Sequence, residues 1–541
     1  MHFHLRLFIL ALILAGSVFV GPRLGAQAQS GDGAWSNFEN ASNTPTTSSW
    51  PAIVADTAGN VHLFWAEDAD GKTDNPDLSY DIGLGPGIDE TGRRVNLLKE
   101  WGESLYYTRW DGEKWYPPVN IHVSPVLPNG VVLYPETTVD PQGMLHVIWL
   151  GAWHVTGTVF YMRAPADQAL SPSAWSQPKQ VAGPVAVSAG FGQDIVSDLN
   201  GGLHILYSQI GIEGDYGGAY VINSFDGGDT WSSPVLLYAT PPDQGVNSVQ
   251  IIVDKAGRLH ATWSHWNLTG NGQEVYYAQS RDEGRTWSKP HPIAVRQPDW
   301  YEVDWLSVGV VGDEVHALWE GGIGAYLNER ISHDGGLTWD KPYRILNNLV
   351  GENGWAEMLT DSADNLSMTV VKRGSANPVI HGLWATQWTN SDWEPPLLLG
   401  TTRSDFYDIA DQTIMRLDAL VMVRGTFTGN GLRYQRSTIL NGNEIFVALN
   451  QNFDGEIHVT HRKLLAPFIA PQPYPTPQAT PTPTPLPRLP TPTWPPPSVS
   501  LPNSPTGGTE GNPANYILIA LLPVLVLIGG VLVSRANIRR R

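Results

Sequence analysis

One stretch of the sequence, residues 299–305, gathers side chains that can bind or act on carbohydrate. It reads Asp-Trp-Tyr-Glu-Val-Asp-Trp. Carboxylates serve as acid, base or nucleophile at a glycosidic bond, and aromatic rings stack on sugar faces. Tyr301 and Glu302 are candidates for a nucleophile role, although neighbouring strand residues point to opposite faces, which weakens the pairing. With Asp304 and, from an earlier part of the chain, Glu136, they form the predicted catalytic set.

Other predicted loops supply candidates for ligand contact. They are aromatic, imidazole or cationic side chains next to predicted strands: Trp153, His154, Trp266, Trp300, Trp305, Trp355, Arg373 and Arg403. Four carboxylates begin or precede the strands that we expect to be innermost: Glu136, Asp194, Glu357 and Asp408. The alternative for the tryptophans is packing between sheets, since the chain has 22 of them.

An internal repeat positions these residues. An apolar strand, a D-x-x-G turn and a strand of the form apolar-His-apolar-x-Trp recur at 51–65, 137–149, 194–207, 250–263 and 308–319, with a degenerate copy at 357–370. The five equivalent histidines are His62, His146, His204, His260 and His316. Because they belong to five different repeats, they cannot converge on one metal ion. We expect them to pack or to form hydrogen bonds.

Each repeat continues into a third strand and an aromatic turn, then a fourth strand. Three turns match S-x-D-x-G-x-T-W, at 224–231, 280–287 and 332–339. Four short strands at regular spacing, with Gly-rich turns, predict the blades of a β-propeller. Six full units occupy residues 50 to 400, and Ala34-Trp35-Ser36 resembles a fourth strand that closes the ring with the last blade. Residues 401–462 either pad the sixth blade or complete a seventh.

The three turns resemble the Asp boxes of the sialidase superfamily and related propellers. The resemblance implies an all-β, six-bladed propeller of four-stranded antiparallel blades, with seven blades as the alternative. In these boxes the Asp accepts hydrogen bonds from the turn and the Trp packs between sheets, so we interpret the following residues as structural. They are Asp226, Trp231, Asp282, Trp287, Asp334 and Trp339.

The arginines argue against a standard sialidase. Sialidases use three arginines for the substrate carboxylate, a Tyr–Glu nucleophile pair and an Asp acid–base. The first arginine is expected in an Arg-Ile-Pro stretch on the opening strand. Here that strand reads Trp50-Pro51-Ala52-Ile53-Val54, and residues 30–92 contain no arginine. The resemblance therefore supports the fold more strongly than the activity.

The two ends predict an exported, membrane-anchored protein. Residues 1–28 have an apolar run before Ala26-Gln27-Ala28, as in a signal peptide. The propeller is expected over 30–465 and a Pro/Thr-rich disordered stalk over 466–514. Residues 515–534 are apolar enough for a transmembrane helix, and the arginines of 535–541 predict a cytoplasmic tail. The absence of cysteine favours a bacterial cell surface over an animal secreted module.

Charge and composition limit the classes of partner and cofactor that we expect for this chain. A net charge of -19 argues against nucleic acid. We expect no cofactor, with calcium in the acidic loop 68–90 as the alternative to a solvated loop.

Three functions remain. The first is a surface-displayed propeller that binds glycan or another extracellular polymer. The second is an exo-acting, sialidase-like glycoside hydrolase with a divergent site, and the third is a protein-docking scaffold. The sequence leaves the oligomeric state open.

Overall fold

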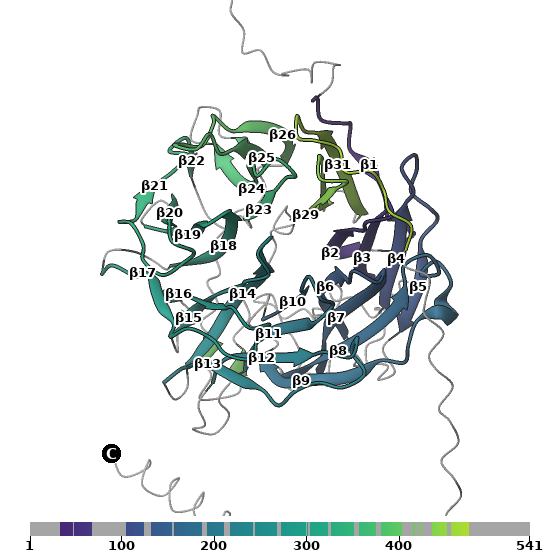
Figure 1. Ribbon diagram of the computed structural model, residues 1–541, viewed down its shortest axis with the longest axis horizontal. Helices are drawn as coiled ribbons and strands as arrows, with labels where there is room; N and C mark the ends of the chain where they lie inside the picture. Colours follow the sequence, from purple (N-terminus) through teal and green to yellow (C-terminus); the bar gives the residue numbers. More distant parts are fainter. Residues whose placement is uncertain are drawn as a thin grey trace, which may run out of the picture. The chain divides into compact units, whose positions relative to one another are not determined.

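The chain folds as an all-β ring of sheets. The computed structural model describes residues 33–46, 48–67, 104–123, 131–153, 156–186, 192–209, 217–241, 244–267, 272–298, 300, 303–322, 326–350, 356–374, 380–402, 415–416, 421–422, 435–451 and 456–474. Seven antiparallel sheets surround a common centre, each built from strands in the order inner to outer (Figure 1). A short β27–β28 pair, Met415–Arg416 and Val421–Met422, and a 3-10 turn, Pro172–Ala174, complete the described secondary structure.

The blades are numbered here in chain order, with the innermost strand given first. Blade 1 is β2 (Ser48–Ala55), β3 (Val61–Glu67), β4 (Ser104–Trp110) and β5 (Val119–Val123). Blade 2 is β6 (Val131–Val139), β7 (Met144–Trp153), β8 (Thr156–Pro165) and β9 (Lys179–Ala186). Blade 3 is β10 (Gln193–Ser197), β11 (Leu203–Gln209), β12 (Gly218–Ser224) and β13 (Val235–Ala239).

The remaining blades follow the same plan. Blade 4 is β14 (Gly245–Val253), β15 (Leu259–Trp266), β16 (Gly272–Ser280) and β17 (His291–Val295). Blade 5 is β18 (Val303–Val311), β19 (Glu314–Gly321), β20 (Tyr326–Ser332) and β21 (Tyr343–Arg344). Blade 6 is β22 (Leu349–Val350) with β23 (Ala356–Thr360), β24 (Leu366–Gly374), β25 (Ile380–Gln387) and β26 (Leu397–Thr402). Blade 7 is β29 (Gln435–Leu440), β30 (Glu444–Gln451), β31 (Glu456–Lys463) and β1 (Glu39–Asn40).

The expected count of six blades is wrong, and the alternative of seven is correct. Residues 435–463 form a separate sheet and do not pad blade 6. Blade 7 departs from the repeat, because Phe446 stands where blades 1 to 5 have His, and the Asp-box motif is missing. Its outer strand comes from the other end of the chain: β1 pairs with β31, and Trp35 bridges Arg462. The N-terminal segment thus closes the ring, as the sequence predicted.

In blades 1 to 5 the repeated histidine connects the second strand to the preceding turn and to the third strand. In blade 2 the Nε2–H of His146 donates to Asp140 over 3.2 Å, and the Tyr161 hydroxyl lies 2.8 Å from Nδ1. The same hydroxyl lies 3.1 Å from the carbonyl oxygen of Gly227, in the Asp box of blade 3. This buried chain of contacts links neighbouring blades, which explains why the histidine recurs at one strand position.

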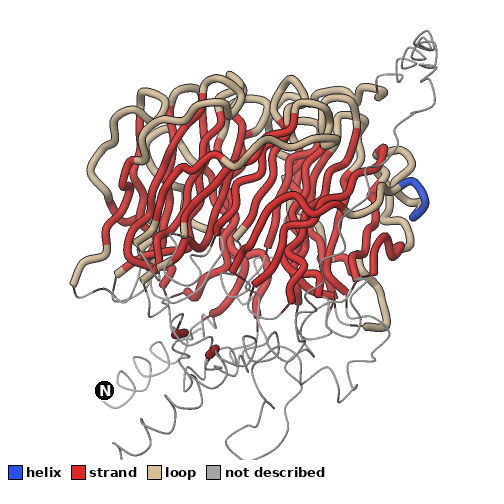
Figure 2. Tube along the Cα trace, turned by 90° about the horizontal axis from the view of Figure 1, so that it is seen from below, coloured by secondary structure: helices blue, strands red, loops and turns tan. Residues whose placement is uncertain are grey.

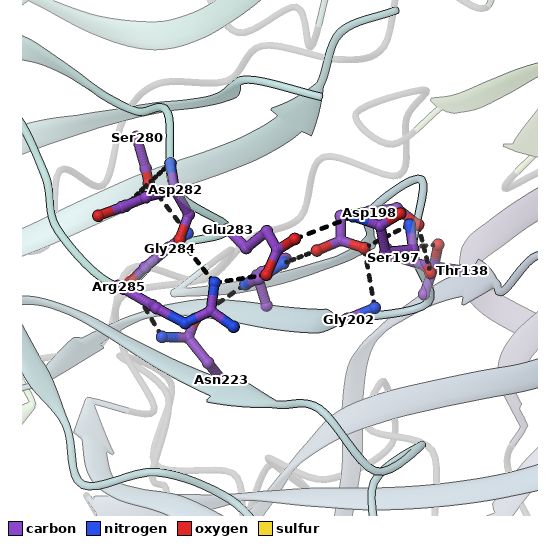
Figure 3. Close-up of polar contacts among 12 residues, drawn as sticks. Thr138, Ser197, Asp198, Gly202, Asn223, Ser280, Asp282, Glu283, Gly284 and Arg285 are labelled. Carbon is purple, nitrogen blue, oxygen red and sulfur yellow. Dashed lines mark hydrogen bonds and ion pairs between the residues drawn. The ribbon is translucent and has the colours of Figure 1, made fainter. Parts of the chain in front are cut away.

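The Asp boxes are compact hydrogen-bonded turns. In blade 4 the Ser280 hydroxyl donates to Asp282 over 2.9 Å and accepts from the Gly284 amide at 2.9 Å (Figure 3). The Asn223 side chain of blade 3 donates to the Gly284 carbonyl at 3.0 Å, so the box also joins two blades. In the box of blade 3, the Thr230 side chain and amide hold the pKa of Asp226 at about 2. These contacts describe a structural turn with no reacting group.

The two ends of the strands form two faces, seen edge-on in Figure 2. The face that carries the turns between first and second strands and the Asp boxes is called the Asp-box face. The opposite loop face carries the connections from second to third strands and from each blade to the next. Fully buried Trp65, Trp149, Trp263 and Trp319 fill equivalent second-strand positions between the faces. The repeated Trp of the sequence motif is therefore core.

The predicted ends of the chain are described in part. Residues 466–474, which the sequence assigned to the stalk, lie on the propeller and are considered below. A second compact unit, Pro477–Arg541, is outside the described residues, as are residues 1–32. Within the described part of the chain no helix is both long and apolar enough to cross a membrane. The predicted span 515–534 and the acidic loop 68–90 are also outside it.

The buried histidines make stability fall in mild acid. Burial lowers the pKa of His62, His146 and His260 below the ordinary 6.5, and their aspartates offset this only in part. The unfolded chain then binds more protons below pH 6.5, so the free energy of unfolding should drop as pH falls from about 7 to 5. In His146→Asn the free energy of unfolding should depend less on pH between 7 and 5, by the equivalent of about one bound proton. Urea titrations at several pH values measure this dependence. An unchanged slope would contradict the assignment.

Blade 5 should show the opposite trend. Burial lowers the pKa of His316, but Glu314 and Glu329 bond its two ring nitrogens at 2.9 and 2.7 Å and raise the pKa overall. The imidazolium contribution is complete below pH 6.5 and is lost as pH rises through the raised pKa. His316→Asn is therefore an internal comparison for His146→Asn in the same pH titrations. It should change the slope of the free energy of unfolding against pH above pH 6.5.

Candidate functional site

Each of the seven blades contributes one inner-strand residue at the same register position. These seven residues form a ring around the centre of the propeller. Each lies opposite a second-strand residue two positions after the repeated histidine or its equivalent, as in Glu136 opposite Ile148 and Arg436 opposite Ala448. We call this set the channel ring: Ala52, Glu136, Asp194, Gln250, Ser307, Glu357 and Arg436. The set includes three carboxylates and one guanidinium, carried by the inner strands that surround the centre of the ring (Figure 1).

Arg436 is the electrostatic centre of the channel ring. Its Nη1 donates to Glu357 over 2.9 Å, and its Nε donates to Glu136 over 3.1 Å, with a second contact from Nη2 to Glu136. Glu136 belongs to blade 2 and Glu357 to blade 6, so one side chain joins blades on both sides of blade 7. Blade 1, which lies between, contributes only the small Ala52 at this level. The two-sided guanidinium fork suits this bridging role.

Asp194 differs from the two glutamates. Its Oδ2 accepts the amide of Ile251 in blade 4 at 2.8 Å, and its Oδ1 accepts the next amide, Ile195, at 2.8 Å. It remains partly exposed to the channel. Burial, and then the nearby Glu136, raise the pKa of Asp194 well above its ordinary value. Burial also raises the pKa of Glu136, against the opposing effect of Arg436. Asp194 is the ring carboxyl most disposed to hold a proton.

A second polar cluster lies nearer the loop face, between blades 4 and 5. Asp304 is fully buried on β18 and accepts the indole N–H of Trp266 at 3.0 Å. Asn247 of β14 donates to the same oxygen over 3.4 Å. Trp300 is half-buried and packs on the core of blade 5, with its amide bonded to the Gln297 carbonyl at 3.0 Å. Two predicted ligand residues are thus held by neighbouring blades.

The same edge of blade 4 carries a histidine–glutamate pair. His265 lies 3.2 Å from Glu274 through Nδ1 and 2.6 Å from Gln244 through Nε2. The Tyr276 hydroxyl donates to Glu274 over 2.7 Å, and the Tyr238 ring stacks obliquely on Tyr276 at 4.5 Å. Glu274 and the two tyrosines are partly exposed. This group offers hydrogen-bonding carboxylate, amide and aromatic surfaces beside Trp266.

The structure brings together some predicted residues and leaves others undescribed. Glu136 joins the channel ring, whereas Asp304 and Trp266 meet in the separate cluster between blades 4 and 5. Asp304 has no exposed surface, so it acts as a buried acceptor in this conformation. Tyr301, Glu302, His154, Trp355, Arg403 and Asp408 lie outside the described residues. For Trp153, Trp305 and Arg373 the strands are described but the side chains are not.

Arg436 is the functional candidate that the sequence prediction missed. It stands at the position of Glu136, Asp194 and Glu357, but this equivalence appears only after blade 7 is aligned with the other blades. Because Phe446 replaces the repeated histidine, the sequence of blade 7 does not match the repeat. Counting back ten residues from Phe446, by analogy with His146 and Glu136, would have found it.

The arrangement supports polar recognition more readily than metal binding. Among the described residues, no group of three or more His, Asp or Glu side chains is placed to hold a metal ion. The guanidinium of Arg436 is shared by two glutamates, and the ring carries more carboxylates than arginines. A sialic-acid carboxylate at the level of the channel ring would meet this surplus of negative charge.

Comparison with known proteins yields structural similarity only. No protein-family model matches the chain, and no curated protein matches it in sequence. Among solved structures, a protein of unknown function from Dyadobacter fermentans is 17% identical, with a TM-score of 0.42, and the match covers 79% of this chain and 99% of that chain. A polysaccharide lyase, an ulvan lyase, is 11% identical, with a TM-score of 0.47 and coverage of 76% and 93%.

A sialidase is also among the similar structures. A Hadza microbial sialidase is 10% identical, with a TM-score of 0.38, and the match covers 67% of this chain and 74% of that chain. The predicted propeller fold is confirmed by the ring of antiparallel, mostly four-stranded sheets in this chain. Identities this low do not transfer an activity.

Proposed function

We propose that this chain is a carbohydrate-binding propeller that presents its loop face to an extracellular glycan or related polymer. The observation that carries the proposal is the pairing of a closed polar channel ring with half-buried Trp266 and Trp300 on the same side of blades 4 and 5. Indole rings held in place by neighbouring blades suit stacking on sugars, and the carboxylates and amides around them suit sugar hydroxyls. The predicted signal peptide, stalk and anchor fit display outside a cell.

Binding is favoured over hydrolysis because the ring glutamates are already engaged. A glycosidase needs a carboxyl free to exchange a proton with the substrate and a second one to stabilise or attack the anomeric carbon. Glu136 and Glu357 both bind Arg436 instead. The same engagement leaves no ring arginine to receive an acidic sugar, so the proposed ligand is a neutral glycan.

One observation supports a hydrolase as the second candidate. Asp194 is partly exposed to the channel, and burial with the nearby Glu136 raises its pKa well above the ordinary range. A carboxylic acid that stays protonated near neutral pH is what a general acid requires. In that case Asp194 would protonate the leaving oxygen, and the partner carboxylate would be Glu136 released from Arg436.

Retention on an array of neutral and acidic glycans tests the proposal, with the purified full chain and two tryptophan variants. Trp300→Ala should weaken retention of neutral glycans at least about tenfold, equivalent to ~1.4 kcal/mol of lost contact. Trp339→Ala is the matched control, because Trp339 packs on the same blade 5 core but belongs to an Asp box on the opposite face. Melting curves establish that both variants are folded at the assay temperature.

A panel of fluorogenic glycosides, including a sialoside, separates the alternatives. Turnover that Asp194→Asn abolishes would replace the binding proposal with the hydrolase. Retention of sialylated glycans in preference to neutral ones would contradict the charge argument. Absence of both retention and turnover would reject carbohydrate as the ligand and favour protein docking.

A further inference from the structure

The chain does not leave the propeller where its last strand ends. After β31, residues 464–474 run across the Asp-box face as an extended segment without strand pairing. The Leu464 amide donates to the Asn443 carbonyl at 2.7 Å, and the Ile469 amide donates to the Asn441 carbonyl at 2.8 Å, both in the first turn of blade 7. The segment then reaches blade 1, where the Gln472 amide donates to the Thr57 carbonyl at 2.7 Å.

Side-chain contacts also hold the same segment. In blade 6 the Ser362 hydroxyl donates to the Pro467 carbonyl at 2.5 Å. At the other end the Tyr474 hydroxyl donates to Asp56 of blade 1, and the ring joins the apolar cluster between blades 1 and 2. Burial and the bond to Asp56 raise the pKa of Tyr474, so it remains a hydrogen-bond donor over the physiological range.

Two turn glycines admit the segment. Gly59 of blade 1 and Gly143 of blade 2 both have positive φ, at +91° and +80°. A Cβ on Gly59 would lie 3.0 Å from Pro471, and a Cβ on Gly143 would lie 2.1 Å from the Tyr474 ring. The equivalent Gly257 of blade 4 has φ +78°, and its Cβ would meet nothing nearer than Leu199 at 3.7 Å. The equivalent Gly201 of blade 3 would place a Cβ 2.6 Å from the Gln142 side chain, so the segment is the close neighbour at Gly59 and Gly143 but not there.

We propose that the turns of blades 6, 7, 1 and 2 form an interaction surface whose partner is residues 464–474 of the same chain, which we call the clasp. Blade 7 is the blade in which the ring closes, because its two-residue outer strand β1 comes from the N-terminal part of the described chain. The clasp spans the junction between blades 7 and 1 and ties together blades on both sides of it. It also fixes the exit of the chain on the Asp-box face, opposite the loop face, whatever ligand the loop face binds.

The test compares two glycine-to-alanine variants in the full chain by amide hydrogen exchange. Both Gly143→Ala and Gly257→Ala place alanine at nearly the same positive φ in the same kind of turn, so the backbone strain is matched. Only Gly143→Ala collides with Tyr474. We expect the amides of Ile469 and Gln472 to exchange at least about tenfold faster in Gly143→Ala and at the wild-type rate in Gly257→Ala.

Two outcomes overturn the clasp. One is exchange of the Ile469 and Gln472 amides at unprotected rates in the wild-type chain. The other is an equal effect of both alanine variants on these amides. If Gly143→Ala does not fold, Tyr474→Ala provides the same comparison without backbone strain. Protection that survives in Tyr474→Ala would likewise reject the proposal, and its loss there, with blade 4 amides unchanged, would support it.

Discussion

Arg436→Met is expected to lower the free energy of unfolding by about 3–5 kcal/mol, the usual cost of removing one partner from a buried ion pair. Glu136 and Glu357 would lose the guanidinium that they share, in a site with little access to solvent. Urea denaturation at pH 7 measures the loss. Arg436→Lys should recover part of the stability, because lysine keeps the charge but cannot contact both glutamates through a planar fork.

The pH dependence of this variant distinguishes electrostatics from lost packing. Without Arg436, the pKa of Glu136 should rise further above its unfolded value, since burial already raises it. The folded variant then binds a proton that the unfolded chain does not bind. The loss in free energy of unfolding relative to wild type should therefore become smaller as pH falls from 7 to 5. A deficit below about 1 kcal/mol at pH 7, or one that does not change with pH, would show that the channel ring is not held by this charge pairing.

Lys372→Met is expected to cost a similar amount, about 3–5 kcal/mol, by leaving a buried carboxylate without its ammonium. Lys372 of blade 6 contacts Glu320 of blade 5, and both side chains are almost completely buried. The double variant Lys372→Met with Glu320→Leu should recover most of the loss, because apolar side chains of similar volume avoid the burial of charge. Thermal and urea unfolding of both variants measure the effect.

A surface ion pair in the same protein serves as the control for this prediction. Lys255 and Asp364 also form an ion pair, but their side chains are 60% and 53% exposed. Lys255→Met should change the free energy of unfolding by no more than about 1 kcal/mol, as is usual for solvated pairs. Equal losses in Lys255→Met and Lys372→Met would contradict the assignment of the larger effect to burial.

The candidate site illustrates what a linear motif can and cannot reveal. Glu136, Asp194 and Glu357 were expected near the innermost strands because each begins or precedes a copy of the internal repeat. Their common level, and the shared contact with Arg436, required the register of seven sheets. Glu136 and Arg436 are 300 residues apart in sequence, so no local pattern connects them. Asp304, which the sequence placed in the candidate catalytic set, lies at a fully buried position on β18.

The sequence by itself determined the local units of this protein. Alternating apolar residues specify the strands, and the D-x-x-G and Asp-box turns specify how strands return, because Gly and Asp fit those turns and few other residues do. The repeated histidine marks the buried second strand of blades 1 to 5, and a tryptophan follows it in four of them. All these features depend on neighbours within a few residues, so they are visible without a structure.

Only the tertiary structure decided how many units close the ring and which residues meet inside it. Blade 7 lacks the histidine and the Asp box, and it is completed by β1 from the opposite end of the chain. The clasp also looked like the start of a Pro-rich stalk until its contacts with Thr57 and Asp56 were seen. Closure depends on long-range packing and on hydrogen bonds between distant segments, whose partners are set by the geometry of the complete ring.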